Sequence, residues 1–440
     1  MQEELKTALK DAAKKLFNTE IEPEITRTDE QFGDYATNAA LQLAKKAAAT
    51  PQQIAKQLVD ELQNLPGFET PTIAGPGFIN FTLTDEALQK AAHSATDLPK
   101  PNAGQEILVE FGDPNPFKEM HIGHVYSYIT GDAISSLLEA SGAKARRLSY
   151  HGDIGLHVAK AIWAISKNEK IMSGESELSK AMLVDFGLFY AEGAKAYEQD
   201  EKAKDEISEI NKKIYDKADP QINELYEWGK DKSFAYFDEI LRDLGIHASE
   251  RFLESQSAKK GEELVEQNVD KVFEKSEGAI VFKGEKAGLH TRVFVTSNGL
   301  PTYETKDLGL AELKKEKFPG AKQSLIVTAH EQAGYFKVML AALAEIDEPT
   351  AKMTKHLYHG FVSLSSGKMS SRTGEVYGAV DLIGDVDEAT QKAFGQKSSS
   401  TRNSAIKYGF LKHRLGSDIV YDVTESVALE GNSGPYLQYA

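Results

Sequence analysis

Residues 107–125 read ILVEFGDPNPFKEMHIGHV, a pattern that indicates a strand, a turn and the start of a helix. Its apolar start, 107–111, is typical of a buried strand, and apolar residues then recur at helical spacing from Val125 to Leu138. The turn between strand and helix carries two histidines, a glycine and a lysine. Because a helix start presents backbone N–H groups and a positive dipole end, such a turn favours an anion. We therefore predict a nucleotide-phosphate site here.

The side chains of this turn suit phosphate chemistry. His121 and His124 can donate hydrogen bonds to phosphate oxygens, and Lys118 adds a fixed positive charge. Gly123 lets a bulky ligand approach the backbone. With 11 histidines and 34 glycines in 440 residues, chance would supply about 0.02 His-x-Gly-His sequences. The alternative is two surface histidines at a helix start, but the strand before them and the helix after them favour a site.

A second candidate element lies far downstream, where residues 365–374 read SSGKMSSRTG. A Gly/Ser-rich loop that carries Lys368 and Arg372 could close over a triphosphate and neutralise its developing charge. Most such loops are solvated connections, so this element alone is a weak indication. Together, and in this order along the chain, H-I-G-H and K-M-S-S-R resemble the two signatures of class I aminoacyl-tRNA synthetases.

Further segments resemble one family within that class, the arginyl-tRNA synthetases, and together they cover almost the whole chain. The resemblance implies that the chain activates L-arginine with ATP, giving arginyl-adenylate and pyrophosphate, and transfers arginine to the 3' end of tRNA(Arg). In chain order, the matching segments are GDYATN (33–38), AGPGFINF (74–81), VEF (109–111), PN (114–115), HGDIG (151–155), PTYETKD (301–307), EQ (331–332) and EGNSGPYLQYA (430–440).

The resemblance also implies roles for the residues of the two signatures. The catalytic residues would be Lys118, His121, His124 and Lys368. ATP would be bound by His121, Gly123, His124, Lys368, Met369 and Ser370, with Mg²⁺ sharing the work on the phosphates. Many relatives lack the first lysine of the second signature and use a lysine upstream of H-I-G-H instead. This chain has both, which leaves the division of roles between Lys118 and Lys368 open.

The arginine pocket is expected to combine acids and polar side chains. By the resemblance, Glu110 and Asn115 would hold the ammonium and carboxylate end of arginine. Tyr303 would shape the pocket, and Gln332 would add a side-chain contact. Independently, a guanidinium favours a planar carboxylate that accepts two parallel N–H bonds, a role that Asp307 fits. The alternative for Asp307 is a solvated acid near a helix start, where acids are favoured. A site built on such bonds rejects analogues that lack the donors, so no editing domain is required.

The expected fold class is α/β, with a Rossmann-type catalytic domain preceded by a small α+β domain. Apolar spacing predicts a helix over residues 5–17, and Thr50 with Gln53 forms a capping box. The domains would be 1–100 as a tRNA-elbow-type domain, 105–375 as the catalytic domain with a helical insertion at about 165–275, and 376–440 as a helical connection. The strands of the parallel sheet are expected near 107–111, 145–150, 291–296 and 325–328.

Contacts with tRNA are expected in two kinds of place. In the family, the N-terminal domain touches the tRNA elbow, and Phe78 and Asn80 sit where that contact would be made. The alternative is a core phenylalanine and a turn asparagine. The formal net charge of −16 opposes nucleic-acid binding on average, so local basic clusters matter. Candidate clusters, which could also be solvated faces, are Lys144, Arg146 and Arg147, and Arg402, Lys407, Lys412 and Arg414.

Composition narrows the class of protein. The chain has no cysteine, which excludes disulfides and thiolate metal sites and suits a reducing compartment. It has no signal peptide and no run of eighteen apolar residues. The histidines are too scattered to indicate a metal cluster. We therefore expect a cytoplasmic protein without a membrane segment or a metal held by its own ligands, acting as a monomer.

The sequence stops at Tyr439-Ala440, where the helical anticodon-binding domain of the family begins. We expect that domain to be missing, either because the chain is shortened or because it is a natural variant. Two other functions stay open from the sequence. One is a regulatory relative that binds arginine without charging tRNA. The other is a nucleotidyl-transferring enzyme of the same fold that acts on a small carboxylic acid.

Overall fold

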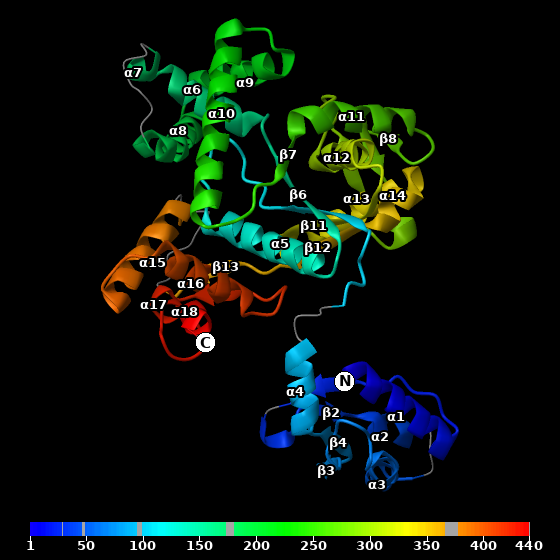
Figure 1. The fold of residues 1–440 in the computed structure, drawn as a ribbon. Coiled ribbons are helices and arrows are strands. Elements are labelled where there is room, and N and C mark those ends of the chain that lie inside the picture. The colour runs from blue at the N-terminus through cyan, green and yellow to red at the C-terminus, as the bar shows by residue number, and fades with distance from the viewer. Residues whose placement is uncertain (29, 46–48, 95–98, 173–179, 366–376, 440) are drawn as a thin grey trace. The chain divides into compact units, whose positions relative to one another are not determined.

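The computed structural model describes residues 1–28, 30–45, 49–94, 99–172, 180–365 and 377–439. The chain forms two compact units, Met1–Pro99 and Lys100–Ala440 (Figure 1). Each unit has a hydrophobic core of its own, and each is described by itself.

The smaller unit is a four-stranded antiparallel sheet with helices packed on it, in the strand order β1-β2-β4-β3. Its apolar helix stripe is the one that the sequence predicts, since Leu5 and Leu9 are fully buried. The capping box is also confirmed: Thr50 Oγ1 accepts the Gln53 N–H at 3.3 Å, and Gln53 Oε1 accepts the Thr50 N–H at 3.0 Å. The elements are α1 Gln2–Phe17, β1 Ile25–Arg27, η1 Glu30–Phe32, β2 Tyr35–Thr37, α2 Ala39–Ala44, α3 Pro51–Leu62, β3 Thr72–Ala74, β4 Phe78–Phe81 and α4 Asp85–Ser94.

The larger unit is built on a five-stranded parallel sheet, in the order β12-β11-β5-β6-β7. Helices cover both faces, as expected for a Rossmann-type fold. Ile107 and Val109 of β5 join the core that contains α5, whereas Leu108 packs with Leu310 of α12 on the opposite side. The strands are β5 Glu106–Phe111, β6 Lys144–His151, β7 Glu250–Leu253, β11 Ala321–Ala329 and β12 Thr354–His359.

One predicted strand lies outside this sheet. The segment expected at 291–296 forms β10, Arg292–Val295, but β10 belongs to a separate antiparallel sheet in the order β10-β9-β8. Only a short connection separates it from β9, Ala279–Phe282, and a parallel crossover needs a dozen or more residues. The third strand, β8, spans Glu274–Ser276.

For the helical insertion predicted at 165–275, the structure differs at the end of the range. Helices run from Leu156 to Asp243, but the chain then returns to the main sheet as β7 and opens the small sheet with β8. The helices of the larger unit are α5 Ile122–Ala140, α6 Leu156–Ser166, α7 Glu169–Met172, α8 Lys180–Gln199, α9 Glu201–Asp216, α10 Pro220–Asp243, α11 Glu254–Gln267, α12 Tyr303–Lys317, α13 Ala333–Ile346, α14 Glu348–Met353, α15 Ala379–Phe394, α16 Ser399–Leu411, α17 Val423–Ser426 and α18 Gly434–Tyr439, with η2 at Gly284–Ala287 and η3 at His330–Gln332.

The last part of the chain is mainly helical and packs on the main sheet's helix layer. Figure 1 shows α15 and α16, drawn in orange to red, beside α5. The Ser/Thr-rich segment separates these two helices because the Ser398 side chain caps α16 by accepting the Thr401 N–H at 3.2 Å. A short parallel pair, β13 Val362–Leu364 with β14 Ile419–Tyr421, ties this part to the end of β12.

Two glycines allow α11 and α12 to pack closely. A Cβ atom at Gly261 would lie 1.9 Å from the Thr305 carbonyl oxygen, and one at Gly309 would lie 2.0 Å from the Ser257 carbonyl oxygen. Both clashes involve backbone atoms, which cannot rotate away. Because α12 carries Asp307, this contact sets the position of the predicted specificity residue.

We expect Gly261→Ala to lower the free energy of unfolding by about 1–3 kcal/mol, because it overpacks the α11–α12 contact. Urea denaturation measures this change. The matched control is Gly384→Ala in α15, where a Cβ would meet no atom within 4 Å. Alanine should stabilise that helix by up to about 1 kcal/mol. Equal stability of the two variants would contradict the role of the close helix contact.

Candidate active site

The first signature forms the start of α5, and its two histidines cap the helix. The Nδ1 atom of His121 accepts the Gly123 N–H at 3.1 Å, and the Nδ1 atom of His124 accepts the His121 N–H at 3.3 Å. The two rings stack with centroids 3.6 Å apart. A backbone N–H can only donate, so both Nδ1 atoms carry no hydrogen. Each neutral ring therefore holds its hydrogen on Nε2, where it can be donated to a ligand oxygen.

Burial keeps both histidines uncharged. It lowers the pKa of His121 to about 4 and holds the pKa of His124 well below its usual range. The nearby Lys118 charge acts in the same direction on both rings. At neutral pH the pair consequently offers hydrogen-bond donors rather than positive charges.

The histidines open into a cavity of about 660 Å³ at the carboxyl ends of β5, β11 and β12. In open parallel sheets, ligands bind at this edge, and the volume suits a nucleotide-sized molecule. Gln332 reaches the cavity from η3, which follows β11 directly. The residues that line this cavity include Asp113, His121, Gly123, His124, Ser127, Thr328, Glu331 and Gln332.

The chain that follows the second signature is tied to the first. The Ile122 N–H donates to the Tyr377 carbonyl at 3.0 Å, and the Ala379 N–H donates to the Met120 carbonyl at 2.8 Å. The residues that directly follow the second signature are therefore anchored at the start of α5. The predicted ATP-binding residues Lys368, Met369 and Ser370 themselves lie outside the described residues.

Lys118 sits close to the histidines with its charge uncompensated by a carboxylate. Its Nζ atom lies 4.4 Å from the centre of the Tyr190 ring. No ion pair in the described part of the chain involves Lys118. Burial lowers its pKa, and the Lys160 charge contributes. A cation held in this way gains stabilisation from an anionic ligand.

The predicted guanidinium ligand, Asp307, lies in an acidic environment on α12. It accepts a hydrogen bond from the Tyr335 hydroxyl, and burial raises its pKa to about 7. With Glu110 it lines a small cavity of about 10 Å³, room for about one water molecule. Tyr303, expected to shape the pocket, is 69% exposed at the start of the same helix.

Glu110 does not face the large cavity, contrary to the role expected for it. The carboxylate is buried and forms an ion pair with Lys314, which is also buried. A buried acid is stable only with such a partner. Asn115 is occupied as well, since its Oδ1 atom accepts the Gly152 N–H at 3.0 Å and joins the signature turn to the segment after β6.

Sequence reasoning missed Asp113, which lines the large cavity next to the histidines. Its backbone has a φ of 54°, a left-handed conformation that aspartate adopts more readily than most residues. Its Oδ1 atom accepts the Tyr150 N–H at 2.7 Å. Burial raises its pKa well above the usual range, and repulsion by Glu110 adds to the shift. The available signal was an acid directly after a buried strand, the same signal that singled out Glu110.

The two predicted tRNA-binding residues lie on β4 of the smaller unit. Phe78 is 40% exposed, whereas Asn80 is 8% exposed and lies on a strand that is paired on both sides. Both alternatives to tRNA binding are therefore wrong, because the phenylalanine is not in the core and the asparagine is not in a turn. Phe78 is free to stack on a ligand, and Asn80 is largely committed to the sheet.

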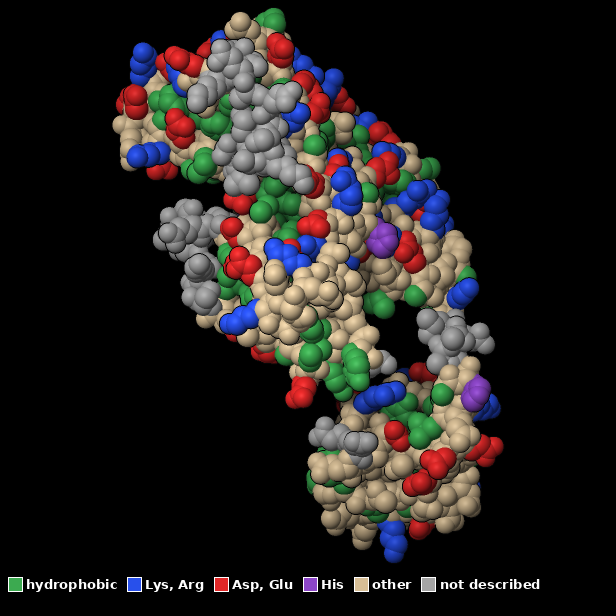
Figure 2. Space-filling view, turned by 60° about the vertical axis from the view of Figure 1, so that its left-hand side comes forward, with side chains coloured by type: hydrophobic (Ala, Val, Ile, Leu, Met, Phe, Trp, Pro, Cys, Tyr) green, Lys and Arg blue, Asp and Glu red, His purple; other side chains and the backbone are tan. Residues whose placement is uncertain are grey.

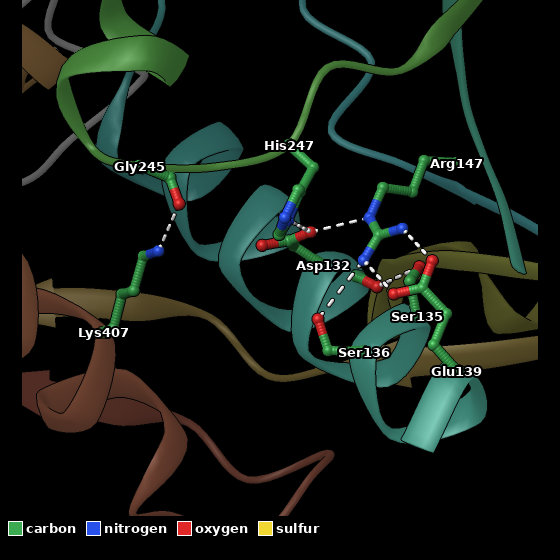
Figure 3. Close-up of polar contacts among 9 residues, drawn as sticks. Asp132, Ser135, Ser136, Glu139, Arg147, Gly245, His247 and Lys407 are labelled. Atoms are coloured by element: carbon green, nitrogen blue, oxygen red, sulfur yellow. Dashed lines mark hydrogen bonds and ion pairs between the residues drawn. The ribbon is translucent and has the colours of Figure 1, made fainter. Parts of the chain in front are cut away.

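Most side chains of the predicted basic clusters form ion pairs within the larger unit. Figure 3 shows Arg147 between Asp132 and Glu139 of α5, at 2.8 Å and 2.6 Å. It also shows Lys407 donating to the Gly245 carbonyl at 2.6 Å. On the face drawn in Figure 2, basic side chains are interspersed with acidic ones. The remaining pairs are Lys144 and Arg146 with Glu106, Arg402 with Asp243 and Asp387, and Lys412 with Glu425.

The described residues contain no helix that is long and apolar enough to cross a membrane. They also contain no group of three or more histidine, aspartate or glutamate side chains arranged to hold a metal ion.

Comparison with known proteins identifies the relatives of both units. The family described as "tRNA synthetases class I (R), catalytic domain" matches residues 86–407, and "Arginyl tRNA synthetase N terminal domain" matches residues 2–83. The arginine–tRNA ligase of Limosilactobacillus reuteri is 30% identical over 462 residues, covering 100% of this chain and 80% of that protein. That of Lactobacillus delbrueckii subsp. bulgaricus is 28% identical over 438 residues, covering 94% and 74%.

The fold has a solved counterpart. The arginyl-tRNA synthetase of Thermus thermophilus superimposes with a TM-score of 0.78 at 22% identity, over 100% of this chain and 80% of that one. Since the family models match most of the sequence and a relative aligns over all of it at 30% identity, this chain belongs to the arginyl-tRNA synthetase family.

Proposed function

We propose that this chain activates L-arginine with ATP and transfers the arginyl group to the 3' end of tRNA(Arg). The observation that carries the proposal is the pairing of two neutral histidine donors with a partly buried aspartate in one parallel-sheet fold. The first arrangement suits a phosphate that gains negative charge, and the second suits a guanidinium.

In the first step, a carboxylate oxygen of arginine attacks the α-phosphorus of ATP. The bond from that phosphorus to the bridging oxygen breaks, and pyrophosphate leaves. His121 and His124 donate their Nε2 hydrogens to phosphate oxygens, and Lys118 supplies a positive charge. We assign Lys368 to the β- and γ-phosphates together with Lys118. The protein positions the reactants and stabilises charge, and its histidines need not exchange a proton.

In the second step, a hydroxyl of the terminal tRNA ribose attacks the carbonyl carbon of arginyl-adenylate. The ester to the ribose forms as the bond to the phosphate oxygen breaks, and AMP leaves. The leaving group is the phosphate that the two histidines hold, so the same donors serve both steps. For the smaller unit, we propose that the exposed Phe78 stacks on a base of the tRNA.

Magnesium fits this site as a companion of ATP. Mg²⁺ usually keeps several waters and binds through substrate phosphates plus one or two carboxylates, and it neutralises phosphate charge when bound. We place the reaction in the cytoplasm, where charged tRNA is used in translation.

Arginine selection rests on Asp307. The Tyr335 hydroxyl holds its carboxylate, and Gln332 lies at the edge of the neighbouring cavity. A substrate without guanidinium donors would leave this acid buried and unpaired, which costs binding free energy. That cost gives the enzyme its discrimination against uncharged analogues.

Replacing Asp307 by asparagine tests this proposal. Removing one partner of an enclosed charge pair costs about 2–5 kcal/mol, so arginine-dependent ATP–pyrophosphate exchange should fall from about 30-fold to several thousand-fold. ATP binding, measured by calorimetry, should stay near the parent value. The matched control is Asp205→Asn on the exposed surface of α9. Exchange within a few-fold of the parent would contradict the specificity assignment.

A pair of variants at position 121 isolates the Nε2 donor. His121→Asn keeps an acceptor that can cap α5 but lacks a donor at the Nε2 position. We expect kcat for exchange to fall about 10²–10³-fold, with the KM for arginine unchanged. His121→Gln places an amide hydrogen near the lost one and should recover part of the rate. Equal rates in the two variants would show that the donor is not what matters, and the exposed His93→Asn is the control.

The arginine affinity of the free enzyme should rise with pH. Asp307 has a pKa of about 7, in a site that also holds Glu110, Lys314, Glu254 and Tyr335. Below that pH its proton competes with the guanidinium, so the dissociation constant for arginine should fall about tenfold from pH 6 to pH 8. Calorimetric titration at pH 6, 7 and 8 measures this. The affinity for magnesium–ATP should change little, and a constant arginine affinity would contradict the prediction.

A further inference from the structure

The acids around the end of β5 outnumber the cations. Glu110 and Asp307 lie close enough to Asp113 for their charges to raise its pKa. Lys314 is the buried cation beside these acids. Lys314 forms its ion pair with Glu110. Within the described residues, Asp113 and Asp307 have no ion-pair partner. Two carboxylates are thus left to be matched by a ligand.

Asp113 and Asp307 open toward different spaces. Asp307 lines the small cavity with Glu110, whereas Asp113 lines the large cavity with His121 and His124. One oxygen of Asp113 is fixed by the Tyr150 N–H, and no hydrogen bond to its other oxygen is formed by the described residues. The fixed oxygen holds the side chain in place, and the second oxygen can accept a bond from a ligand.

The chemistry of arginine favours an acid in this position. The α-ammonium group and the reacting carboxylate are attached to the same carbon, so both must lie at the α-phosphate when the guanidinium is bound to Asp307. The phosphate lies at the two histidines by the mechanism above. The acid that receives the ammonium group must therefore line the histidine cavity, which Asp113 does and Glu110 does not.

We propose that Asp113 binds the α-ammonium group of arginine and is, with Asp307, the second specificity-determining carboxylate of this enzyme. The inference rests on the proposed function and sharpens it. Glu110 then has a positioning role, because it fixes Lys314 beside the two acids. Two carboxylates that bind two cationic groups select arginine over guanidinium compounds that lack the amine.

Asp113→Asn removes the charge and little else. Asparagine tolerates the left-handed backbone at this position, and its Oδ1 atom can still accept the Tyr150 N–H. The decisive measurement is binding of three ligands to the parent and to this variant by calorimetry. L-arginine has all three charged groups, agmatine lacks the carboxylate, and 5-guanidinopentanoic acid lacks the amine.

We expect Asp113→Asn to weaken arginine and agmatine by about 30-fold or more and to leave 5-guanidinopentanoic acid within about twofold. Asp307→Asn, by contrast, should weaken all three because each carries a guanidinium. Asp205→Asn again serves as the surface control. The double comparison separates loss of the ammonium contact from a general change in the pocket.

Other outcomes overturn the inference in identifiable ways. Equal weakening of all three ligands by Asp113→Asn would show that Asp113 acts only through the shape of the turn. Weaker binding of magnesium–ATP alone would assign Asp113 to the nucleotide. Unchanged binding of every ligand would leave Glu110 as the partner of the ammonium group. If the parent itself fails to bind arginine, the proposed function fails, which is a different result from all of these.

Discussion

The hydrogen bonds from two backbone N–H groups to the Nδ1 atoms of His121 and His124 are the constraint on which the site depends. Through these bonds the two rings cap the start of α5. Because each Nδ1 atom accepts a hydrogen bond, the hydrogen of each neutral ring lies on Nε2. A helix start that is capped in this way presents neutral donors to a ligand while the rings stay fixed. Burial reinforces the arrangement because it keeps both rings uncharged at neutral pH.

A division of charge follows from this arrangement. The side proposed to bind phosphate holds neutral donors and the cation Lys118, whereas the side proposed to bind the amino acid holds Asp113 and Asp307, whose pKa values are raised by burial. Each side is therefore stabilised by the ligand that it is proposed to bind. The close packing of α11 on α12 holds Asp307 in place, so the fold and the proposed specificity of the site are coupled through one helix contact.

The sequence predicted the parts of this structure that depend on local patterns. Apolar periodicity located β5, α5 and α1, and the Thr50 capping box was readable from residue spacing. The sequence could not assign β10 to its sheet, because the apolar pattern of a strand does not indicate which strand it pairs with. The sequence also could not show that Arg402 forms an ion pair, because its partner Asp243 lies far away in the chain. The Glu110–Lys314 pair was hidden for the same reason.

ATP–pyrophosphate exchange with a panel of amino acids, with and without tRNA(Arg), tests the central claim most directly. Neutral phosphate donors combined with the two carboxylates proposed to bind the substrate predict exchange with arginine and not with lysine or citrulline, because lysine lacks the planar donor pair and citrulline lacks the charge. Exchange with citrulline at a rate close to that with arginine would show that the carboxylates do not select the substrate. Exchange with an unrelated amino acid alone would contradict the arginine assignment itself.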